Sequence, residues 1–442
     1  MTTSDSRGLP LSTSSPEAAA SYRAGIDLLL SAWPGGIPAL EAAVAADERF
    51  ALAHAARARA LAGRGEIKEA QAAAAKARAW VAARGSERER SHVEAIALAV
   101  SGRTRDAIDR TLAHLEAWPR DALILSLPLG AFGLFAFSGM ADHDQARVDL
   151  CERHAGAYAA DDWWYLTYRG WSQTENGAVR LGRALSERAY GLRRENANAV
   201  HALSHAMFED GSGDDATRLI DDWLPGYDRS GALHGHIAWH QALSALDEGD
   251  AARALAIYEA HVRPPANAGA AINVVTDGAS LLWRLDAYGH GAPRALWDEI
   301  ARHAAAAYPN GGNAFVEAHL ALIAAGTGDE AALRHRLDTV AARGGPADPT
   351  VVALGRGAHA LAEGRHAECA AILEPMAGEI SRIGGSHAQR EIVEDTLLIA
   401  LMRAGESGKA AALLDERLHR RPSPRDARWR AGLNSPASDR PH

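Results

Sequence analysis

Four histidines in the middle of the chain form two matched pairs, His201/His205 and His236/His240. The members of each pair are four residues apart, so on an α-helix both imidazole rings lie on the same face. The second pair follows the first by 35 residues with the same spacing. Imidazole nitrogens bind zinc and iron, which take three or four such ligands in proteins. The spacing therefore makes these four histidines candidate ligands of one divalent metal ion.

Other ionisable and aromatic residues recur at similar intervals around these pairs. Asp277 follows His240 by 37 residues, and the segment GGSHAQR (384–390) is predicted to begin a later helix. If successive helices place equivalent positions side by side, these side chains line one concave surface with the histidines. The candidate ligand-binding residues are Trp164, Tyr168, His201, His205, His236, His240, Asp277, Glu317, His319, His387 and Arg390.

Several of these residues have a second interpretation that involves no ligand. Trp164 and Tyr168 are four residues apart, a spacing that suits a packed core as well as the wall of a pocket. Asp277 could instead form an ion pair with Arg284, which lies two turns later on the same predicted helix. Arg390 has the chemistry either to bind an anion or to act as a structural clamp.

Helices separated by short glycine turns are predicted to position these residues. The chain has 442 residues, of which 47% are hydrophobic and only 6% are aromatic. Much of the hydrophobic content is alanine, which favours helix because it loses no side-chain entropy there. Turns such as Gly249-Asp250 and Gly328-Asp329 recur mostly every 31 to 43 residues. This period is typical of tetratricopeptide (TPR) repeats, so we predict an all-α, right-handed α-α superhelix of about ten helix pairs.

A single repeat domain is predicted over residues 17–425. Within it, residues 17–117 are generic alanine-rich repeats, and residues 118–425 have a more distinctive sequence. Residues 1–16 are rich in Ser, Thr and Pro, which predicts a disordered leader. Residues 426–442 are rich in Pro, Arg and Ser and are expected to be a flexible tail.

Composition and missing motifs argue against several classes of function. The net charge is −9 and no basic cluster occurs, so nucleic acid is not an expected partner. The apolar segment 123–139 contains Pro128 and Gly130, so we predict that it is buried and that no segment crosses a membrane. Neither a phosphate-binding loop nor a dinucleotide-binding glycine motif is present, so no nucleotide cofactor is expected. Two distant cysteines, Cys151 and Cys369, and the lack of a signal-peptide core indicate a cytoplasmic protein.

Seven strings in the second part of the chain occur in an order that resembles a known family. They are WPRD (118–121), HALSHAMFEDG (201–211), HGHIAWHQAL (234–243), SLLWRL (280–285), FVEAH (315–319), GGSHAQRE (384–391) and ALLDERL (412–418). In this order they are similar to the tetratricopeptide repeat protein 38 family, over residues 118–430, and GGSHAQR is the most specific string. The resemblance implies a TPR-like α-α superhelix and no established activity. The chain departs from the family at two positions. Many relatives have a glutamate three residues after the position of His205, where this chain has Phe208 followed by Glu209. Many relatives also have an aspartate at the position of Glu317.

Two functional interpretations follow, besides one in which the histidines only hold helices together. In the first, the repeats bind a peptide or a small molecule in a concave groove lined by His, Asp and aromatic residues. In the second, the same pocket belongs to an enzyme that uses a divalent metal, or a carboxylate as general base with a neutral histidine as acid. In the structural interpretation, the histidines form hydrogen bonds with one another and with backbone groups between packed helices.

Overall fold

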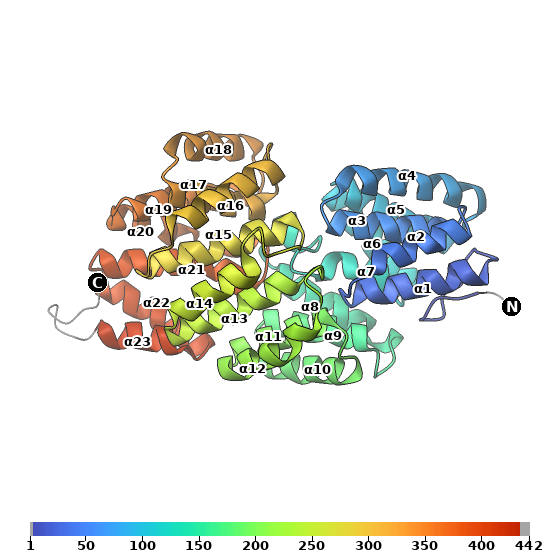
Figure 1. Cartoon of the computed structure of the whole chain (residues 1–442), viewed down its shortest axis with the longest axis horizontal. Helices are drawn as coiled ribbons and strands as arrows, with labels where there is room; N and C mark the ends of the chain where they lie inside the picture. The colour runs from blue at the N-terminus through green and yellow to red at the C-terminus, as the bar shows by residue number, and fades with distance from the viewer. Residues whose placement is uncertain (1–2, 434–442) are drawn as a thin grey trace. The chain divides into compact units, whose positions relative to one another are not determined.

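The structure, a computed structural model of the chain, describes residues 3–433 and is built from α-helices (Figure 1). This part of the chain contains 23 α-helices and one isolated β-bridge, between Ser4 and Pro10. The prediction of an all-α fold of the α-α superhelical, TPR-like class is confirmed. Contacts divide the chain into two compact units. Of the described residues, unit 1 comprises 3–138, 143–202 and 230–233, and unit 2 comprises 139–142, 203–229 and 234–433.

Unit 1 contains the first ten helices, most of which pack in consecutive pairs. Small residues allow these helices to approach closely: a Cβ on Gly182 would lie 2.1 Å from the hydroxyl of Thr174 on the preceding helix. The helices are α1 (Pro16–Leu30), α2 (Gly36–Ala46), α3 (Ala51–Gly63), α4 (Ile67–Arg84), α5 (Glu87–Val100), α6 (Thr104–Ala117), α7 (Ala122–Leu129), α8 (His143–His154), α9 (Trp163–Glu175) and α10 (Val179–Leu192). All eight residues of α7 are buried, so residues 123–129 of the apolar segment are buried as predicted, while several of residues 130–139 are only partly buried.

The leader predicted to be disordered is instead packed against unit 1 over its described residues. The side chain of Arg88 on α5 donates a hydrogen bond to the carbonyl oxygen of Pro10 at 2.7 Å. The backbone N–H of Ser12 donates to a carboxylate oxygen of Glu89 at 2.9 Å. Leu11 is also buried. Composition alone missed this order, because the leader satisfies buried charged groups of α5 rather than forming a helix of its own.

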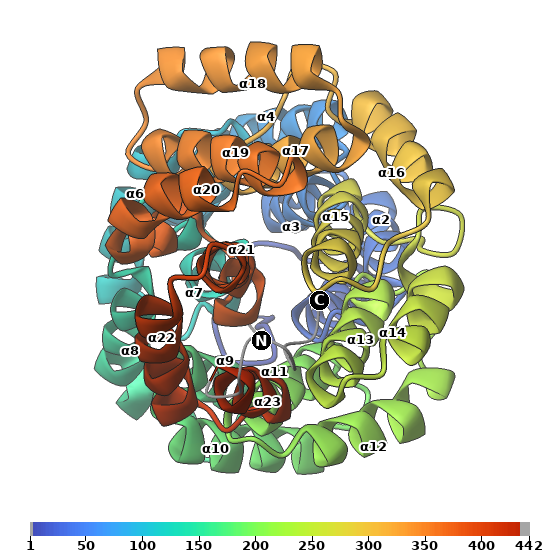
Figure 2. The same cartoon turned by 90° about the vertical axis from the view of Figure 1, so that its left-hand side faces the viewer.

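Unit 2 is an array in which one helix of each pair lies inside and the other outside. Figure 2 shows α13, α15 and α17 on the inner side, with α12, α14, α16 and α18 around them. The helices are α12 (Gly213–Trp223), α13 (His234–Glu248), α14 (Ala251–Ile257), α15 (Ala271–Ala287), α16 (Arg294–Ala307), α17 (Ala314–Thr327), α18 (Glu330–Arg343), α19 (Asp348–Ala362), α20 (His366–Leu373), α21 (His387–Arg403), α22 (Ser407–Arg420) and α23 (Pro424–Gly432). Helix α17 ends at Thr327 and is capped by Gly328, which has a φ of +67° and is one of the predicted glycine turns.

The last helices of unit 2 pack back onto earlier inner helices, α21 against α15 and α23 against α13. The first residues of the predicted flexible tail therefore form part of α23. Ser423 caps this helix, and Asp426 makes an ion pair with Arg417 at 2.8 Å. This pair explains why residues 426–432 are helical despite their polar composition. Residues 434–442 of the predicted tail lie outside the described residues.

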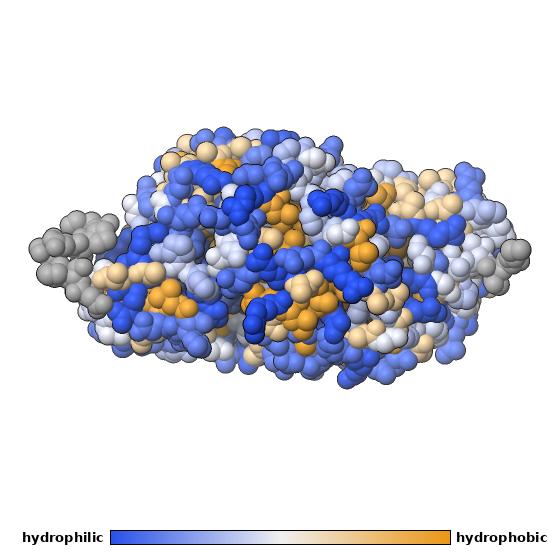
Figure 3. Space-filling model, turned by 90° about the horizontal axis from the view of Figure 1, so that it is seen from below, coloured by the Kyte–Doolittle hydropathy of each residue, from blue (hydrophilic) through white to orange (hydrophobic). Residues whose placement is uncertain are grey.

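The surface drawn in Figure 3 is mostly hydrophilic, with hydrophobic residues in small separate groups. Among the described residues, the large hydrophobic side chains that are exposed are Ile67, Leu181 and Leu192. No helix within residues 3–433 combines the length and the apolar character needed to cross a membrane.

Candidate functional site

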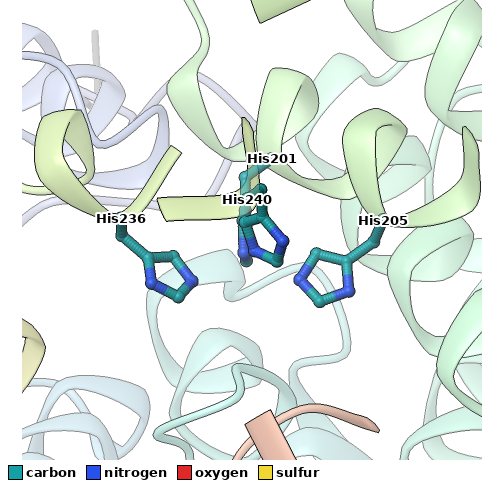
Figure 4. A group of neighbouring side chains, drawn as sticks. All are labelled: His201, His205, His236 and His240. Carbon is teal, nitrogen blue, oxygen red and sulfur yellow. The ribbon is translucent and has the colours of Figure 1, made fainter. Parts of the chain in front are cut away.

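Helices α11 (Ala197–Glu209) and α13 bring the predicted histidines together. The rings of His205 and His240 meet edge to face with centroids 4.2 Å apart, and those of His236 and His240 do so at 4.9 Å. One ring nitrogen of each of these three histidines lies within 4.8 Å of the corresponding nitrogen of the other two. All three side chains are buried, with exposed fractions of 0 to 4%. The four-residue spacing within α13 therefore places two imidazoles beside a third from α11 (Figure 4).

His201 stands one turn before His205 on the same continuous helix. The division between the two units falls inside α11, between residues 202 and 203, so His201 is assigned to unit 1. Its ring stacks on Trp171 of that unit, with centroids 5.2 Å apart.

Asp277 on α15 orients one of the clustered histidines. Its Oδ2 lies 2.8 Å from Nδ1 of His236, and its side chain is only 1% exposed. The alternative prediction, an ion pair of Asp277 with Arg284, is wrong. The guanidinium of Arg284 instead binds Asp395 on α21 at 3.1 Å and the carbonyl oxygen of Ala388 at 2.9 Å. Two turns of helix separate the side chains of residues 277 and 284 by about 10 Å, so each finds its partner on another helix.

Trp239 holds the rings of the two neighbouring histidines on α13. Its ring stacks on His236 with centroids 5.4 Å apart and meets His240 edge to face at 4.9 Å. Its side chain is fully buried. Sequence reasoning did not single out this residue, although its place between two of the candidate histidines in WHQ was a signal.

Glu317 and His319 on α17 make local contacts. Glu317 accepts hydrogen bonds from the backbone N–H of Gly312 at 2.8 Å and from Arg336 at 2.7 Å, so it fixes the loop before its own helix. Nδ1 of His319 donates to the carbonyl oxygen of Phe315 at 2.8 Å. Burial lowers the pKa of His319 to about 4, which keeps its imidazole neutral.

The GGSHAQR segment makes a tight turn at the start of α21. Arg390 donates a hydrogen bond to the carbonyl oxygen of Gly385 at 2.6 Å, which is the contact expected of a structural clamp. Nδ1 of His387 lies 3.0 Å from a carboxylate oxygen of Glu209, the last residue of α11. Burial alone would raise the pKa of Glu209, but His387 and then Arg421 lower it to about 2. Glu209 was noted in the sequence only as a departure from the family pattern, since its partner is 178 residues away.

Trp164 and Tyr168 lie on α9 and belong to unit 1. Their rings are 5.3 Å apart, and the guanidinium of Arg7 lies 5.4 Å from the ring of Trp164. Tyr158 also contacts Trp164, at 5.9 Å between centroids. Trp164 is fully buried, so within unit 1 this pair forms part of an aromatic core.

A second group with metal-ligand chemistry, His92, His114 and Asp121, lies buried in unit 1. Both histidines and Arg88 contact the same carboxylate oxygen of Asp121, and the guanidinium approaches it to 2.7 Å. Burial would raise the pKa of Asp121, but His92 and then His114 and Arg88 hold it well below its ordinary value. A guanidinium already neutralises this carboxylate, so a divalent cation there would be repelled. The group is better explained as an ion-pair network that joins α5, α6 and α7.

No family model matches the chain. Among solved structures, it is similar to a Rap protein complexed with competence and sporulation factor, with a TM-score of 0.39 and 12% identity over 84% of this chain and 99% of that chain. It is similar to yeast Tom70 with a TM-score of 0.32 and 13% identity over 94% of this chain and 95% of that chain. For the TPR domain of P58(IPK), the TM-score is 0.23 and the identity 14%, over 89% and 90% of the two chains.

Proposed function

We propose that this protein is a TPR-like helical-repeat protein that binds a peptide or a small molecule on the inner helices of unit 2. The ligand site is centred on His205, His236, His240 and Asp277. The observation that carries the proposal is the distribution of buried polar groups between the inner and the outer helices, described next.

Among the outer helices α12, α14, α16 and α18 of unit 2, Thr217 on α12 is the one buried residue that is not hydrophobic. Helices α14, α16 and α18 bury only hydrophobic residues. The inner helices α13 and α15 bury hydrophobic residues too, and they add three histidines, the ionisable residues Asp247, Asp277 and Arg284, and several hydroxyl and amide groups. Burying such groups costs free energy unless they are paired, and the outer helices show that the repeat packs without them. A binding role explains why they gather on one side of the array.

We also propose that the chain belongs to the tetratricopeptide repeat protein 38 family. Support comes from the roles of the residues in GGSHAQR. Gly385 has a φ of +81°, and a Cβ on it would lie 2.5 Å from the ring of Phe315. Ser386 and Gln389 form a capping box at the start of α21. With the Arg390 clamp and the pairing of His387, most residues of the string have a stated physical role.

An enzyme that uses the same site is the second candidate function. The contact of Asp277 with His236 favours it, because a buried carboxylate that orients an imidazole is common to metal-dependent and acid–base catalysis. An enzyme at this site would need either a bound metal ion or an acid–base pair that contacts the substrate.

The ligand is sought by thermal unfolding of the full chain with three sets of probes. These are a tryptic digest of serum albumin for peptides, the common amino acids and dicarboxylates, and the nucleoside phosphates. We expect one set to raise the Tm of the wild type and of His335→Gln, an exposed histidine on the outer helix α18. Adding the same set should not raise the Tm of His240→Gln or of Asp277→Asn above the value that each variant has without probes. Stabilisation by none of the sets, or equal stabilisation of all four proteins, would overturn the proposal.

A further inference from the structure

We propose that His205, His236 and His240 bind one divalent transition-metal ion, and that Asp277 is the residue that positions His236 for it. The inference rests on the proposed function, because it names the first ligand of the same site. Metal binding can nevertheless be measured separately, because the experiment does not require the peptide or small molecule to be identified.

The geometry of the three rings suits a shared metal ion. A metal bound by imidazole at about 2.0–2.1 Å in a tetrahedral site separates its nitrogen ligands by about 3.3 Å. The nitrogens of His205, His236 and His240 already lie within 4.8 Å of one another. We expect rotations about side-chain bonds to close the difference when a metal binds. Figure 4 shows the rings gathered side by side between their helices.

Asp277 gives His236 the form that a metal ligand needs. A carboxylate oxygen 2.8 Å from Nδ1 favours the tautomer in which Nδ1 carries the proton. The lone pair is then on Nε2, the ring nitrogen away from Asp277. Carboxylate–histidine–metal contacts of this kind orient the ring and increase the basicity of the ligand. Asp277 is therefore a positioning residue.

The donor set indicates the class of metal. Three imidazole ligands suit Zn²⁺, Co²⁺, Ni²⁺ or Cu²⁺, whereas Mg²⁺ and Ca²⁺ require oxygen ligands. Neither cysteine belongs to the group, so thiolate chemistry is not involved. We therefore assign the site to Zn²⁺ or a metal of similar preference.

Cobalt binding tests the assignment on chelator-treated full-length protein. Co²⁺ bound by nitrogen ligands absorbs visible light, and it should quench the emission of Trp239, whose ring contacts two of the ligands. We expect one equivalent to bind to the wild type, with quenching that is absent in Trp239→Phe. The visible absorption should be lost in His205→Gln. Asp277→Asn should bind about 10–100-fold more weakly and change the absorption spectrum, as loss of an orienting carboxylate does.

His234→Gln is the matched control, because His234 is a buried histidine on the same helix α13. Its Nδ1 lies 3.1 Å from the carbonyl oxygen of Tyr227, and its Nε2 lies 3.2 Å from His261. This variant should bind Co²⁺ as the wild type does. Far-UV circular dichroism checks that each variant is folded. If His205→Gln is unfolded, Asp277→Asn decides, since it changes a charge and almost no volume.

Failure of this inference is distinguishable from failure of the proposed function. Absence of Co²⁺ binding by the wild type, or equal binding by His205→Gln, overturns the metal site. If the chelator-treated protein is nevertheless stabilised by one set of probes, the proposed ligand site stands without a metal. If Co²⁺ binds as expected and no probe stabilises the protein, the metal site stands and the peptide or small-molecule function fails.

Discussion

Glu209→Gln tests the ion pair that joins the end of α11 to the start of α21. The carboxylate of Glu209 lies 3.0 Å from Nδ1 of His387 and 4.0 Å from Nε of Arg421. The pKa values of both Glu209 and His387 are shifted. Burial acts to raise the pKa of Glu209, yet the two cations bring it to about 2 from its ordinary 4.5. Burial acts to lower the pKa of His387, yet Glu209 raises it above 6.5.

The magnitude follows from the pKa of Glu209. The difference between 4.5 and about 2 corresponds to about 3 kcal/mol of folding free energy at 1.36 kcal/mol per pKa unit. Because the pKa of Glu209 is depressed, its contribution to stability is fully present above pH 4.5 and is lost as the pH falls toward 2. For His387, whose pKa is raised, the stability is present below 6.5 and is lost as the pH rises through the folded-state pKa. The pair therefore stabilises unit 2 most between about pH 4.5 and 6.5.

Urea unfolding at a series of pH values between 3 and 8, followed by circular dichroism, measures this effect. Glu209→Gln should lower the free energy of unfolding by about 3 kcal/mol near pH 6 and flatten its dependence on pH on both sides. Glu374→Gln is the control, because Glu374 pairs with Lys409 at the surface and exposed pairs contribute little. A pH dependence of Glu209→Gln equal to that of the wild type would refute the reasoning, as would an equal stability at pH 6.

Two further predictions concern packing and buried charge, and urea unfolding checks both. Arg284→Met should cost about 3 kcal/mol, because it leaves the buried Asp395 with fewer cations around it; a cost below about 1 kcal/mol would contradict the role given to this pair. Gly326→Ala should cost about 1–3 kcal/mol, because its Cβ would lie 2.6 Å from the ring of Trp297. Gly191→Ala is the counterpart: no atom lies within 4 Å of the added Cβ, so the higher helix propensity of alanine should stabilise α10 by up to about 1 kcal/mol. Equal effects at the two glycines would show that the close approach to Trp297 does not limit the packing.

The histidine cluster could be predicted because its determinants are local and periodic. The four-residue spacing puts His236 and His240 on one face of α13, and the repeat period brings that face beside His205 on α11. The same period predicted the glycine turn at Gly328 and the TPR-like class. Both inferences need only helix geometry and a constant repeat length.

The partners of the ionisable groups could not be predicted, because they are far apart in the sequence. Asp277 has Arg284 within two turns, yet it pairs with His236, 41 residues earlier. Arg284 pairs with Asp395, 111 residues later. Sequence spacing predicts neither partner, because each lies on a helix that contacts α15 only in the folded structure. The order of the leader was missed for the same reason: Ser12 gains its partner Glu89 only when α5 is in place.

X-ray diffraction from crystals of the zinc-loaded full-length protein, recorded on both sides of the zinc absorption edge, tests the central claim most directly. We predict an anomalous peak about 2.0–2.1 Å from ring nitrogens of His205, His236 and His240, with Asp277 still in contact with Nδ1 of His236. A peak at His92, His114 and Asp121 instead, or no peak among the buried histidines of unit 2, would contradict the account.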